Sequence, residues 1–115
     1  MQGGIINMKI GVLNCLKANE CCTGAACLNA LNSRKRSFER YSGKEISLVA
    51  FARCNGCGKG IDAGFTEKLD RIVSEGTEVV HLGICTNMGG RECPTITKAA
   101  DYLKKRGIEI IRGTH

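Results

Sequence analysis

The chain has 115 residues, 43% of them hydrophobic, which is enough for one domain with its own core and argues against dependence on disulfide bonds. It contains no run of eighteen or more apolar residues and no cleavable leader, so we expect no membrane span and a cytoplasmic protein. The net charge of +6 would fall to about +4 if four thiolates bound one zinc ion, so the basic excess is a weak argument for binding nucleic acid.

The densest basic run covers residues 34–36 and is followed by Arg40. Phe38 and Tyr41 occur in the same segment at helical spacing. We therefore favour a solvated helix face with both aromatic rings turned inward over a nucleic-acid surface.

Strand and helix patterns alternate along the chain. Residues 1–7 form a leader to which we assign no function. Four short apolar runs predict strands, over residues 9–13, 46–52, 78–82 and 108–111. Three segments predict helices: residues 24–32 capped by Thr23, a segment around residues 65–73 that ends before Gly76, and one from Pro94 to Gly107. In the first helix we expect Ala25, Leu28 and Leu31 to share one stripe.

This alternation predicts one α/β domain over residues 8–115. We expect a four-stranded, mainly parallel sheet with helices on both faces, the three-layer arrangement of flavodoxin-like and Rossmann-like folds. Right-handed crossovers bring every strand-to-helix loop to the carboxyl edge of such a sheet, where open α/β sheets bind ligands.

The cysteines gather at that predicted edge. All of them lie in the three strand-to-helix loops or in the first helical turn after one: Cys15, Cys21, Cys22, Cys27, Cys54, Cys57, Cys85 and Cys93. Cysteines used only as small core residues would be scattered over strands and helix faces. In a reducing compartment the clustering indicates metal binding or thiol chemistry.

The order of these motifs resembles the CGGC domain family, a group of small cysteine-rich proteins named for a central Cys-Gly-Gly-Cys. The likeness runs from Met8 onward and is carried by Cys15, Cys22-Thr23-Gly24-Ala25-Ala26-Cys27, Phe38, Tyr41, Cys54-Asn55-Gly56-Cys57, His81-Leu82 before Cys85, and Gly113-Thr114-His115. The resemblance implies metal binding, usually of zinc, and no particular reaction. Asn55 replaces the first central glycine, and because Asn tolerates a left-handed backbone we expect the turn to survive.

Four cysteines are our first choice as metal ligands. They lie within about three residues of strand ends, and neighbouring strands are roughly 4.8 Å apart, so their sulfurs can converge on one point. These are Cys15, Cys54, Cys57 and Cys85. Second-choice ligands, which would complete this site or form another, are Cys21, Cys22, Cys27, Cys93 and His115. Thiolates suit zinc first and an iron–sulfur cluster as the alternative.

His81 lies within an apolar strand, which favours a buried, hydrogen-bonded imidazole over a direct metal ligand.

Two enzyme hypotheses stay open beside metal binding. Cys54 and Cys57, next to Arg53 and a helix start, could form a thiol/disulfide redox pair. Cys85 and Arg91 have the C-x5-R spacing of a phosphatase-like loop with a cysteine nucleophile, although that spacing arises easily by chance in a chain so rich in both residue types. The sequence identifies no substrate, protein partner or oligomeric state.

Overall fold

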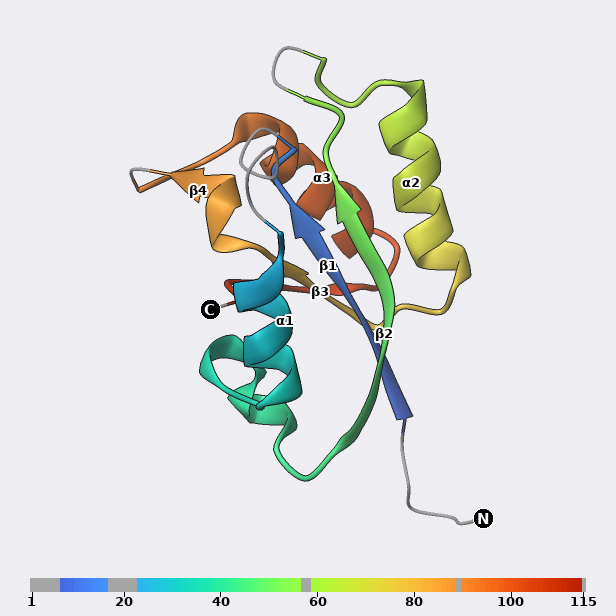
Figure 1. Cartoon of the computed structure of the whole chain (residues 1–115). Coiled ribbons are helices and arrows are strands. Elements are labelled where there is room, and N and C mark those ends of the chain that lie inside the picture. The colour runs from blue at the N-terminus through green and yellow to red at the C-terminus, as the bar shows by residue number, and fades with distance from the viewer. Residues whose placement is uncertain (1–6, 17–22, 57–58, 89, 115) are drawn as a thin grey trace.

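The computed structural model describes residues 7–16, 23–56, 59–88 and 90–114 (Figure 1). A four-stranded parallel sheet has the strand order β2-β1-β3-β6. Its strands are β1 (Asn7–Asn14), β2 (Glu45–Arg53), β3 (Val79–Leu82) and β6 (Glu109–Arg112). The helices are α1 (Ala25–Asn32), α2 (Ala63–Ser74) and α3 (Pro94–Lys104). The predicted α/β fold with a parallel sheet is therefore confirmed.

The sheet contributes to two hydrophobic clusters because neighbouring side chains of a strand point to opposite faces. Ile10 and Val12 of β1 pack with α1 and with the 3-10 helix η2 (Arg36–Tyr41). Leu13 packs with α2 and α3. Phe38 and Tyr41 of η2 are buried, as the sequence predicts, while the basic side chains around them stay mostly exposed.

The predicted stripe on α1 is correct for Leu31 and wrong for Ala25 and Leu28. The buried residues of this helix are Cys27, Ala30 and Leu31, whereas Ala25 is exposed and Leu28 is 37% exposed. Alanine and leucine occur all around this short helix, so its pattern allowed more than one inward face. The contact with the sheet selects the face that carries Cys27.

The connection from β3 to α3 contains structure that the sequence pattern did not predict. A 3-10 turn, η3 (Ile84–Thr86), leads into an antiparallel hairpin of β4 (Asn87–Met88) and β5 (Arg91–Glu92). Glu92 is ion-paired with Arg112 at the end of β6, with 2.6 Å between Oε1 and Nε. This pair joins the hairpin to the carboxyl edge of the sheet.

The leader predicted over residues 1–7 lies outside the described residues except for Asn7, which begins β1. Within the described ranges, the helices are too short or too polar to cross a membrane.

Candidate metal centre

The carboxyl edge of the sheet carries the described cysteines. Cys15 and Cys54 directly follow β1 and β2, and Cys85 lies in η3 just after β3. Cys27 is in the first turn of α1, and Cys93 is the residue before the first turn of α3. The edge predicted from the sequence is therefore the one observed. The predicted ligands Cys21, Cys22, Cys57 and His115 lie outside the described residues.

Two consecutive backbone amides after β1 donate hydrogen bonds to sulfur atoms from the neighbouring strands. The Cys15 N–H donates to Cys85 Sγ at 3.2 Å, and the Leu16 N–H donates to Cys54 Sγ at 3.3 Å. Because β1 lies between β2 and β3, the two bonds draw sulfur from both sides toward the end of the central strand. Amide donors of this kind favour sulfur that carries negative charge.

Asn14, the last residue of β1, contacts both Cys54 and Cys85. Its carbonyl accepts the Cys54 N–H at 3.1 Å, and its buried side-chain Oδ1 lies 3.7 Å from Cys85 Sγ. A Cβ atom at Gly83 would come within 1.9 Å of that Oδ1. The glycine at the end of β3 therefore gives Asn14 the room to reach Cys85.

The pKa of the Cys85 thiol responds to its burial and to the neighbouring cysteines. Burial raises the pKa of the Cys85 thiol, the Cys15 N–H opposes that shift, and negative charge on Cys15 or Cys27 raises the pKa further. A cation among these sulfurs would relieve the repulsion and replace the lost solvation. The donor set is therefore chemically suited to a soft divalent metal.

Within the described ranges, no group of three or more His, Cys, Asp or Glu side chains is already arranged to hold a metal ion. The structure brings Cys85 to the amide of Cys15 and Cys54 to the amide of Leu16, but convergence of four sulfurs stays a prediction. Cys93 packs instead against the core beside α2 and α3.

The Cys54 loop is tied to α2 by a polar network around Asn55. The Asn55 amide donates to Asp62 Oδ1 at 2.9 Å, and Lys68 Nζ donates to Asn55 Oδ1 at 2.6 Å and to the Arg53 carbonyl at 2.8 Å. The same Asp62 oxygen caps α2 by accepting the Phe65 N–H, so its pKa is lowered by that bond first and by Asn55 second.

Our reason for expecting Asn55 to fit this turn is wrong, because its φ is not positive and Gly56 carries the positive φ of 114° instead. Asn55 contributes to this loop through the hydrogen bonds of its side chain, and its backbone is not left-handed. The sequence contained part of this information, since Asp62 stands where a helix cap is expected.

His81 is a buried, hydrogen-bonded imidazole, as predicted. The Gly113 carbonyl can only accept, so Nδ1–H donates to it at 3.1 Å, and Nε2 accepts the Tyr41 hydroxyl at 2.7 Å. Burial lowers the pKa of His81 and keeps the ring neutral. The histidine thereby fixes the backbone before Thr114, whose Oγ1 lies 3.3 Å from Cys27 Sγ.

The described residues between Cys85 and Arg91 form a turn and a hairpin rather than one continuous loop between a strand and a helix. Cys85 lies in η3, and Arg91 pairs with Met88 across the β4–β5 hairpin. A phosphatase-like loop would instead wrap its amides around one anion immediately before a helix. The positions of Cys85 and Arg91 within the described residues therefore do not support the phosphatase-like hypothesis.

Comparison with known proteins gives a consistent family assignment. The model of the CGGC domain matches residues 9–115. An uncharacterized protein of Methanocaldococcus jannaschii is 34% identical over 116 residues, an alignment that covers 94% of this chain and 87% of the relative. No solved structure matches the chain.

Proposed function

The chain belongs to the CGGC domain family, and we propose that it is a metal-binding protein that holds zinc through cysteine thiolates at the carboxyl edge of its sheet. The proposed ligands are Cys15, Cys54, Cys57 and Cys85. Zinc bound by four thiolates serves as a structural centre, whereas an open coordination position would let it act as a Lewis acid.

The paired hydrogen bonds from the amides of Cys15 and Leu16 are the observation that carries this proposal. Each bond supports negative charge on a sulfur, and the two sulfurs come from the strands on either side of β1. Asn14 and Gly83 add close packing at the same point. These residues would orient the thiolates of Cys54 and Cys85, while the loops that carry Cys15 and Cys57 would complete the donor set.

A redox role for Cys54 and Cys57 is the main competing function. Cys54 is buried, which shields its sulfur from a bulky disulfide substrate. This burial favours a ligand that stays in place over a thiol that must be attacked and released.

Metal analysis of anaerobically purified protein tests the proposal. We expect about one zinc per chain and no visible absorbance, whereas a coloured protein containing iron and sulfide would establish the cluster alternative. Metal-free protein with titratable thiols would refute metal binding and support the redox pair.

Serine substitutions then test the ligand set. Cys54→Ser and Cys57→Ser should each lose the metal, and full occupancy in both would place the site elsewhere. Cys93→Ser is the matched control, because this cysteine packs against the core and should leave zinc in place.

A further inference from the structure

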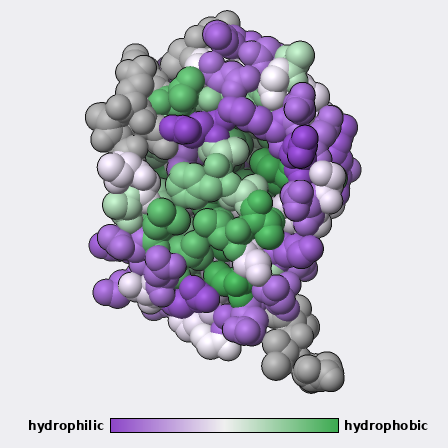
Figure 2. All heavy atoms as spheres, turned by 45° about the vertical axis from the view of Figure 1, so that its right-hand side comes forward, coloured by the Kyte–Doolittle hydropathy of each residue, from purple (hydrophilic) through white to green (hydrophobic). Residues whose placement is uncertain are grey.

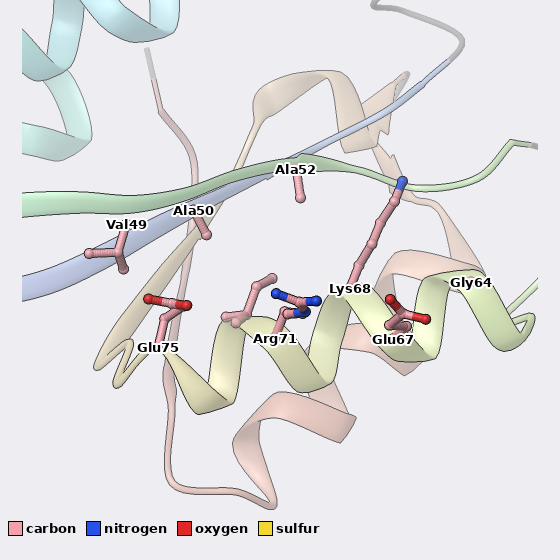
Figure 3. Close-up of a pocket in the computed structure, with 9 residues that line it drawn as sticks. Val49, Ala50, Ala52, Gly64, Glu67, Lys68, Arg71 and Glu75 are labelled. Carbon is pink, nitrogen blue, oxygen red and sulfur yellow. The ribbon is translucent and has the colours of Figure 1, made fainter.

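The outer edge of β2 is open and apolar. β2 is the end strand of the sheet, and Figure 2, which brings the side of β2 and α2 forward, shows hydrophobic side chains in a hollow ringed by polar ones. Phe51 in this strand is 39% exposed. A groove of about 400 Å³ lies between β2 and α2, with Val49, Ala50 and Ala52 on its strand side (Figure 3). An open apolar strand edge is a template for pairing with another strand.

The direction of the peptide groups in β2 follows from its bonds to β1. The Cys54 N–H donates to Asn14, so the peptide groups of Ala50 and Ala52 face β1 while those of Phe51 and Arg53 face the open edge. The hydrogen bond from Lys68 Nζ to the Arg53 carbonyl is consistent with this direction, because it shows that this carbonyl accepts a donor other than β1.

A β-bulge reverses this alternation in the middle of the strand. Leu48 pairs with Ile10 and Ala50 pairs with Gly11, so Val49 is an extra residue. Before the bulge, Ser47 of β2 is paired with Lys9 of β1. The Lys9 carbonyl accepts the Glu78 N–H on the side of β1 away from β2, so the hydrogen bonds of this pair come from the Ser47 peptide groups, which therefore face β1. The open-edge peptide groups are therefore those of Ile46, Leu48, Phe51 and Arg53.

We propose that a second copy of this chain pairs here, with the two β2 strands antiparallel about a twofold axis. One antiparallel register matches open-edge residues on both sides of the bulge: Leu48 lies opposite Phe51 of the second copy, and Ile46 lies opposite Arg53. The result is a continuous sheet with four strands from each copy. Such an interface is self-complementary, as a closed dimer requires.

The side chains in this register fit one another. Ile46 and Leu48 pack against the hydrophobic cluster that the sheet forms with α1 and η2. Phe51 lies on the same face of the sheet, with its ring about 3.1 Å from where a Cβ of Gly24 would be. Leu48 of each copy would cover the exposed ring of Phe51 from the other. Cross-strand pairs of aromatic and aliphatic side chains stabilise antiparallel sheets.

Charge complementarity on the α2 face identifies the partner as a second copy. Figure 3 shows Val49 at the Glu75 end of the groove and Ala50 next to it toward Arg71, and all four residues line that groove. Because the twofold axis passes between Val49 and Ala50, Arg71 of each copy comes beside Glu75 of the other. Among the described residues Arg112 and Glu92 form the one ion pair, so the side chains of Arg71 and Glu75 make no ion pair with another described residue.

Sedimentation equilibrium of the full chain under a phosphine reductant tests this pairing, because the reductant excludes disulfides between copies. We expect a dimer of 2 × 12.4 kDa. Arg71→Glu and Glu75→Arg should each weaken dimerisation roughly tenfold at low salt, since each places like charges together twice. The double variant should restore the wild-type affinity. Both residues are exposed, so these changes leave the fold intact.

Two further variants separate this edge from other surfaces. Phe51→Glu should abolish the dimer, whereas Ile84→Glu, at an exposed apolar residue away from β2, should not change it. The proposal would be overturned by a monomer at all concentrations or by an assembly larger than a dimer. It would also be overturned by a dimer whose affinity is unchanged by Arg71→Glu, Glu75→Arg and Phe51→Glu. Zinc occupancy is measured separately, so the outcome does not depend on the metal proposal.

Discussion

Asn55 and Gly64 should be energetically coupled across the loop that carries Cys54. The Asn55 side chain is bonded to Asp62 and Lys68, and a Cβ atom at Gly64 would lie 2.9 Å from its amide nitrogen. The amide can rotate away from an alanine at that position, but only by giving up its bond to Asp62. Gly64→Ala should therefore have opposite effects in the presence and absence of the Asn55 side chain.

The magnitudes follow from the bonds involved. Asn55→Gly removes two hydrogen bonds to charged groups in a half-exposed site, which should lower the free energy of unfolding by about 2 kcal/mol. Gly64→Ala gains up to about 1 kcal/mol of helix propensity in α2 but displaces the amide at a cost of about 1–2 kcal/mol. It should be neutral or destabilising in the wild type and stabilising in the Asn55→Gly background.

Urea unfolding of the wild type, both single variants and the double variant measures the coupling. We expect a coupling free energy of about 1–2 kcal/mol. Additivity within about 0.5 kcal/mol would show that the Asn55 network does not restrain this loop. Metal affinity measured in parallel shows whether the restraint also positions Cys54.

Three other substitutions probe the packing around the site. His81 has a pKa lowered by burial from 6.5, so as pH falls below 6.5 the unfolded state takes up the proton first and the free energy of unfolding decreases, by at most about 1.4 kcal/mol per pH unit. His81→Gln should remove this pH dependence, and an unchanged slope in denaturation curves would contradict it. Tyr41→Phe leaves His81 Nε2 buried without its donor and should cost about 1–3 kcal/mol in urea unfolding; no change would mean that the bond contributes nothing net. Gly83→Ala should displace Asn14 and cost about 3 kcal/mol or more, and a stable variant with wild-type metal content would refute its proposed role in spacing the site.

The general location of the candidate site was predictable from the sequence, but its internal arrangement was not. Cysteines that follow successive strands of a β/α alternation must meet at one sheet edge, because crossover handedness is nearly invariant. Which cysteine sulfur accepts the hydrogen bond from the Cys15 amide, and which accepts that from the Leu16 amide, depends on contacts between residues 70 and 38 positions apart in the chain. No local sequence pattern encodes contacts between residues so far apart.

The sequence by itself determined the α/β class, the approximate strand and helix positions and the burial of Phe38, Tyr41 and His81. These features depend on apolar periodicity, on helix ends such as Pro94 and on the strand context of His81, all of which act over a few residues. Only the tertiary structure decided which face of α1 is buried, where β2 is bulged and which strand edge stays open. These outcomes follow from strand order and register, which depend on packing between elements that are distant in the chain.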